Sequence, residues 1–87
     1  MIDLVKVKPA GPCSVILTFS DGSFGEWDAG EVIARDTVLT RALADPEFFV
    51  RAFVESGALA WPNGLEFSAR SLQHKLERGG LLKKLAA

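Results

Sequence analysis

Apolar side chains recur at every second position most regularly in residues 13–28, so this segment is expected to lie at the centre of the fold. Val15, Leu17 and Phe19 fall on one side of an extended chain, as in a strand that buries one face. The Asp-Gly pair at 21–22 is typical of a two-residue turn, because both residues accept a left-handed backbone. The chain then runs back to residue 28, so the pattern predicts a β-hairpin.

The length of this turn determines which residues face one another across the hairpin. A two-residue loop pairs Phe19 with Phe24 and Ile16 with Trp27, which places bulky side chains opposite each other. A strand over residues 2–8 is predicted to precede the hairpin and to end at a proline, which has no backbone donor. In that strand we expect the two valines to share one face and the two lysines to share the other; they are Val5 and Val7, and Lys6 and Lys8.

The middle of the chain has the spacing of a broken helix. Apolar residues recur every three to five positions between residues 32 and 43, and Thr37 can cap a second short helix that ends at Ala44. Leu39 and Leu43 lie one turn apart on the expected buried side of that helix. A further turn is predicted at Asp45-Pro46, where aspartate caps and proline suits the first helical position; it carries Phe48 and Phe49 into the core.

A second hairpin is predicted over residues 51–61, followed by a helix. Ser-Gly at 56–57 is a suitable two-residue loop that pairs Val54 with Leu59. After a tight turn at 61–64 and a short strand at 65–67, Ser68 caps a helix that two glycines terminate after Arg78. The predicted class is α+β in one domain: a small antiparallel sheet of about five strands, built from two hairpins and the leading strand, with short inserted helices and a C-terminal helix.

Composition narrows the functional classes. The chain has 87 residues, 48% of them hydrophobic, and a net charge of −1, which gives it no overall attraction to nucleic acid or acidic lipid. The only cysteine, Cys13, cannot form an internal disulfide, and no segment has the length or pattern of a membrane span or a signal peptide. We therefore expect a cytoplasmic protein that does not bind membranes.

No catalytic or cofactor signature is present. The only histidine, His74, lies on the polar side of the predicted last helix, and Cys13 has no neighbour in sequence that would lower its pKa. Glu26 and Asp28 share one face of a strand, which suits acid–base chemistry but is also ordinary for a solvent-facing strand. The glycine pairs lack the spacing of a phosphate loop, and carboxylates do not cluster at metal-ligand spacing. We expect no enzyme, no cofactor and no metal.

Two segments are candidates for partner binding. Tryptophan at a strand end can anchor an interface, although the simpler interpretation is that Trp27 and Trp61 both fill the core of a small domain. The first candidate set is Trp61, Pro62, Asn63 and Gly64. The second lies in the apolar and basic tail at 79–87 and comprises Leu81, Leu82 and Leu85. Homodimerisation is a further expectation, through an unpaired sheet edge or through exchange of the tail, and the sequence leaves both routes open.

The alternative function is nucleic-acid binding, or a transcription-associated role, through the basic C-terminal helix and tail. The residues concerned are Arg70, Lys75, Arg78, Lys83 and Lys84. No aromatic residue follows Phe67, so these cations have no stacking partner nearby in sequence, and such binding is not favoured.

Three motifs together carry a family resemblance. Their order and spacing, with Phe-Ser-Asp-Gly at 19–22, Asp-Pro-Glu-Phe-Phe at 45–49 and Trp-Pro-Asn-Gly at 61–64, resemble the small bacterial proteins grouped as domain of unknown function 2442. The resemblance covers residues 2–76 approximately and implies a compact α+β domain without established catalytic residues. It also implies a partner, because members are often encoded beside another small protein and some are suspected antitoxins. Other members carry a helix-turn-helix domain, for which this chain has no matching segment.

Overall fold

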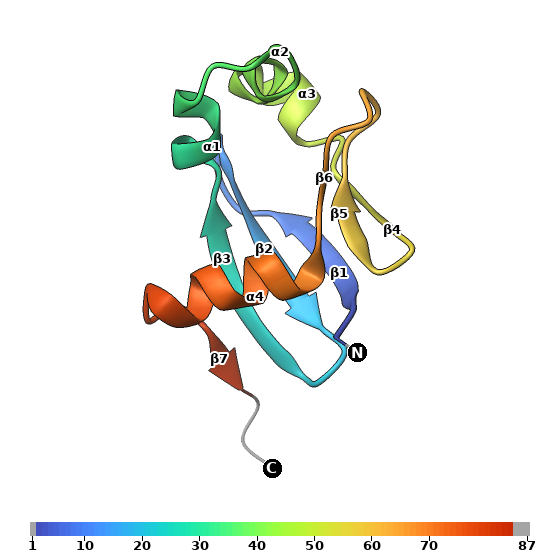
Figure 1. Ribbon diagram of the computed structural model, residues 1–87, viewed down its shortest axis with the longest axis vertical. Helices are drawn as coiled ribbons and strands as arrows, with labels where there is room; N and C mark the ends of the chain where they lie inside the picture. The colour runs from blue at the N-terminus through green and yellow to red at the C-terminus, as the bar shows by residue number, and fades with distance from the viewer. Residues whose placement is uncertain (1, 85–87) are drawn as a thin grey trace.

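A computed structural model describes residues 2–84 of the chain, and its α+β class confirms the prediction. The helices and strands follow one another as β1 (Leu4–Pro9), β2 (Ser14–Phe19), β3 (Ser23–Asp28), α1 (Gly30–Ala34), α2 (Val38–Arg41), the 3₁₀ turn η1 (Ala42–Ala44), α3 (Pro46–Phe49), β4 (Phe53–Glu55), β5 (Ala58–Ala60), β6 (Glu66–Phe67), α4 (Ala69–Arg78) and β7 (Lys83–Lys84). Figure 1 shows α4 crossing one face of the strands β1–β3, with α1–α3 grouped at one end of the molecule.

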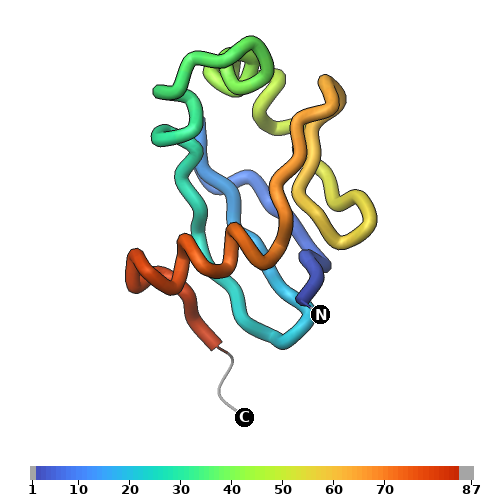
Figure 2. Tube along the Cα trace, in the orientation of Figure 1, coloured from blue at the N-terminus to red at the C-terminus, as the bar shows by residue number. Residues whose placement is uncertain are grey.

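The strands are divided between two antiparallel sheets, whereas the sequence suggested one. The main sheet has the order β1-β2-β3-β7, and the second sheet has the order β4-β5-β6. The helices α1–α3 carry the chain away from β3 before β4 begins, so the second hairpin does not continue the first sheet (Figure 1). It lies instead beside the start of β1 (Figure 2), where the Leu4 N–H donates to the Gly57 carbonyl at 2.7 Å.

The first hairpin forms as predicted, but its register was predicted wrongly by one residue. Thr18 rather than Phe19 faces Phe24, and Val15 rather than Ile16 faces Trp27. The loop contains one residue more than a two-residue turn: the Gly22 N–H donates to the Phe19 carbonyl at 3.0 Å, and Gly22 alone in the loop has a positive φ, of 87°. A shift of the pairing register by one residue moves the side chains of a strand to the opposite face of the sheet relative to its partner strand. Trp27 therefore joins Val15 on the buried face.

The first strand contains a bulge that separates its two valines. Leu4 faces Phe19 and Lys6 faces Thr18, so Val5 is an extra residue in β1. Leu4 is buried and Val5 is 55% exposed. The prediction that Val5 and Val7 share one face is therefore wrong, because the bulge moves Leu4 and Val7 to the core side.

The predicted helix caps are confirmed. Thr37 and Thr40 form a reciprocal capping box on α2, and Asp45 caps α3 with proline at the start of that helix. The predicted burial of Leu43 is confirmed, but that of Leu39 is wrong, since its side chain is 41% exposed and Thr40 is buried in its place. The cause is that α2 tightens into η1 after Arg41, and residues three apart share a face in a 3₁₀ turn.

One core joins both sheets and α4. The second hairpin has the predicted pairing of Val54 with Leu59. The ring of Phe67 in the second sheet lies 5.3 Å from Trp27 of the main sheet and 6.0 Å from Trp61, measured between centroids. The interpretation of both tryptophans as core residues is confirmed, because Trp27 is 5% exposed and Trp61 is 1% exposed.

Candidate functional site

Trp61 is not available to a partner, which corrects its place among the candidate binding residues. Its indole Nε1 donates to the buried Phe49 carbonyl at 3.0 Å, and its ring packs against Phe49. Pro62 and Gly64 are exposed at the tip of the turn, but Asn63 has structural bonds. Its amide donates to the Leu39 carbonyl at 3.2 Å, and its Oδ1 accepts from the Leu65 N–H at 3.1 Å. The turn thus connects the second sheet with α2.

The described part of the C-terminal tail folds onto the main sheet. The Leu81 N–H donates to the Leu76 carbonyl at 2.8 Å, which caps α4, and Leu82 packs against the core. Lys83 and Lys84 then pair with Phe24 and Ser23 as strand β7. Leu81 stays 51% exposed. Leu85, the last of the candidate leucines, lies outside the described residues.

The face of the main sheet opposite α4 is not covered by a helix of the part of the chain that the structure describes. We call it the outer face, and the register places on it the side chains of Lys6, Lys8, Ile16, Thr18, Phe24, Glu26 and Lys83. Ile16 is 36% exposed, and no helix among residues 2–84 lies over the outer face. A shallow depression of about 290 Å³ runs along it between Ile16 on β2 and Leu81 at the sheet margin.

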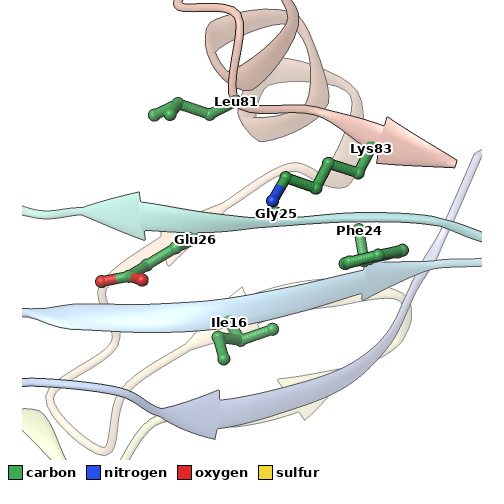
Figure 3. A pocket seen from close by; sticks show the side chains of 6 residues that line it. All are labelled: Ile16, Phe24, Gly25, Glu26, Leu81 and Lys83. Carbon is green, nitrogen blue, oxygen red and sulfur yellow. The ribbon is translucent and has the colours of Figure 1, made fainter.

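Figure 3 shows how the side chains around this depression lie. Ile16 extends from β2, and Phe24 and Glu26 extend from the neighbouring strand β3. Lys83 reaches from β7 over Gly25, so an ammonium and a carboxylate border an apolar centre. Such a surface suits contact with another protein, because apolar contact and charge recognition are combined in one place.

The basic residues of the alternative function do not form one surface. Arg70 and Arg78 are exposed on α4, and Lys75 on the same helix is half-buried. Lys83 points to the outer face, on the other side of the sheet from α4, whereas Lys84 pairs with Ser23 on the helix side. The structure therefore divides these five cations between the two faces.

The candidate chemical groups remain apart as well. His74 is exposed on α4. The Cys13 thiol donates to Asp28 Oδ1 at 3.7 Å; burial raises the pKa of Cys13, and the Asp28 carboxylate raises it further, so the thiol is not activated. Asp28 Oδ1 also accepts from the Gly30 N–H at 2.7 Å, which gives this carboxylate a structural role at the start of α1.

Residues 2–84 contain no group of three or more His, Cys, Asp or Glu side chains placed to hold a metal ion. Over the same residues, none of the helices combines the length and the apolar character that a membrane crossing needs.

A polar network between the first hairpin and α4 was not predicted. Asp21 accepts from the Ser23 N–H at 2.9 Å and from its hydroxyl at 2.6 Å. The Gln73 amide on α4 donates to Asp21 Oδ2 and to Ser23 Oγ, both at 3.0 Å. These donors lower the pKa of Asp21, with the Ser23 hydroxyl as the largest cause. The spacing Asp-x-Ser indicates the local half of the network, but nothing in the sequence points to Gln73.

Comparison of the chain with protein-family profiles, with curated proteins and with solved structures gives no match. The resemblance to domain of unknown function 2442 therefore stays a prediction.

Proposed function

We propose that this protein is a small non-enzymatic interaction module that binds another protein through its outer face. The supporting observation is the apolar centre of that face, where Ile16, Phe24 and Leu81 lie among charged side chains without a covering helix in residues 2–84. Antiparallel sheets commonly expose one face, but that face is then mainly polar. Partly exposed isoleucine and phenylalanine side chains are better explained by a partner.

The family resemblance gives this proposal a more specific form. In that form the partner is a second small protein encoded beside this one, and the chain is the antitoxin-like member of the pair. The outer face and Leu81 then take over the role that the sequence suggested for the turn at 61–64.

Nucleic-acid binding is the rival function. It would rest on Arg70 and Arg78, which are exposed on α4, but the division of the basic residues between two faces weakens it. Binding through phosphate contacts weakens steeply as salt rises, whereas an apolar protein contact does not.

The test is capture of partners from the source cell with the tagged protein, with and without nuclease. Ile16→Asp places a charge at the centre of the outer face and should abolish capture. Val38→Asp is the matched control, because Val38 is also an exposed β-branched side chain, 84% exposed, on α2. We expect one protein that the native chain and Val38→Asp retain after nuclease treatment and that Ile16→Asp loses. A partner that Ile16→Asp still captures, or that nuclease removes, would contradict the proposal.

A further inference from the structure

We infer that the outer face binds a second copy of this chain, face to face, about a twofold axis that runs along β2. The inference rests on the proposed function, and it names a second copy of this chain, in place of a different small protein, as the partner that the same face binds. Charge is distributed unevenly across the strands of the outer face.

The strands β1, β2 and β3 differ in the charge of the side chains that they present on the outer face. β1 presents Lys6 and Lys8, β2 presents the uncharged Ile16 and Thr18, and β3 presents Glu26. In the register, Lys8, Ile16 and Glu26 form one row across the sheet. In this row the sheet is therefore positive on one side of β2 and negative on the other, whereas Lys83 of β7 lies in the neighbouring row, beside Phe24.

Within one chain these opposite charges do not meet. Lys8 and Glu26 lie on opposite sides of β2, two strand spacings or about 10 Å apart. The ion pair between Arg41 and Asp36 is the only one found in residues 2–84, and it lies elsewhere. Both side chains of the row are exposed and remain open to a partner.

A twofold axis along β2 brings the opposite charges together. Rotation about this axis keeps the strand direction and places β1 of one copy over β3 of the other. Lys8 then faces Glu26 of the second copy, twice by symmetry, and Ile16 packs against its own equivalent. Packed sheets lie about 10 Å apart, a gap that a lysine and a glutamate side chain together can bridge.

Other arrangements fit this sheet less well. An axis between β2 and β3 would place Lys6 over Lys83 and Ile16 over Glu26 of the second copy. Edge pairing at β3 is opposed by β7, which already occupies part of that edge. Charge complementarity therefore selects the axis along β2.

The contact should be weak and sensitive to salt. The three strands β1–β3, about 4.8 Å apart and six residues long, give a face of about 300 Å² per copy. A standard protein interface buries about 800 Å² per partner, so association in the micromolar range or weaker is expected.

Sedimentation equilibrium of the purified full chain tests the inference, up to about 1 mM protein at low salt. The native chain should approach the mass of a dimer, and Lys8→Glu or Glu26→Lys should each weaken association about tenfold or more, because like charges then face each other twice. The double variant Lys8→Glu/Glu26→Lys restores opposite charges and should recover association. Glu66→Lys is the matched control, because it reverses the charge of an exposed side chain in the second sheet, and it should leave the association unchanged.

Two results would overturn the inference. One is a native chain that stays monomeric at the highest concentration; the other is a double variant that associates no better than the single variants while its circular dichroism shows a native fold. The proposed function fails separately, through the Ile16→Asp capture experiment. A monomer that still captures a different protein in an Ile16-dependent way would reject only the second copy as partner.

Discussion

Asp21 and Asn63 occupy the same position in the turns of two different hairpins. In each turn the following glycine has a positive φ and donates its N–H to the aromatic residue three positions earlier, Phe19 or Trp61. In each, the side-chain Oδ1 accepts from the N–H two residues later. The difference lies in charge, because Asp21 is ionised and receives two additional donors from Ser23 and Gln73.

The lowered pKa of Asp21 predicts a dependence of stability on acid. The carboxylate bonds contribute fully above its ordinary value of 3.8 and are lost as the pH falls through the lower value of the folded state. Asp21→Asn keeps an Oδ1 acceptor but cannot titrate. Thermal unfolding followed between about pH 5 and pH 2 should show a steeper fall in Tm for the native chain than for Asp21→Asn. Equal slopes for the two proteins would show that Asp21 titrates alike in the folded and unfolded states.

At the scale of elements, the helix caps were predicted correctly, whereas the strand register of the first hairpin was not. The caps at Thr37, Asp45 and Ser68 depend on residues within one turn, so the sequence contains all the information they need. The conformation of the loop at 20–22 is not determined by the residues within it, because Asp-Gly fits a two-residue turn and also the end of a three-residue loop. The choice depends on which face buries Trp27, and that depends on the second sheet.

The approach of the C-terminal segment to β3 depends on Gly25. A Cβ added at Gly25 would lie 2.7 Å from the Leu81 carbonyl oxygen and 3.1 Å from Leu76 Cδ1. We expect Gly25→Ala to lower the free energy of unfolding by about 1–3 kcal/mol, because backbone must move to relieve the contact. Hydrogen exchange should show lost protection at Lys83 and Lys84 first.

Gly79→Ala is the control for this substitution. Gly79 has an ordinary helical φ of −83°, and its added Cβ would come no nearer than 3.5 Å to a neighbour. Its effect on stability should be small. If Gly25→Ala leaves the protection of β7 unchanged, the close packing of Leu81 on β3 does not hold that strand in place.

At the scale of the molecule, the two sheets share a single core. Phe67 contacts both tryptophans, Leu4 bonds to Gly57, and Leu72 of α4 is fully buried in the same cluster. The sequence predicted the burial of Leu43, Phe49 and both tryptophans but not the separation into two sheets. That separation depends on long-range contacts, which hydrophobic periodicity does not contain.

The shared core predicts that both sheets unfold together. Trp27→Phe leaves Trp61 as the only tryptophan, directly after β5 of the second sheet, and Trp61→Phe leaves Trp27, in the main sheet. In each variant, the urea midpoint from tryptophan fluorescence should equal that from far-UV circular dichroism. A fluorescence midpoint that differs from the circular dichroism midpoint in either variant would show that one sheet unfolds independently.

Both margins of the main sheet carry paired lysines, with Lys6 and Lys8 on β1 and Lys83 and Lys84 on β7. A strand of another molecule that approached either margin in register with its own equivalent would place ammonium groups beside ammonium groups. Charged margins of this kind protect sheets against growing into fibrils. The sheet is thus guarded against open-ended polymerisation along its hydrogen-bonding direction, while its outer face stays accessible for an association that closes at two copies.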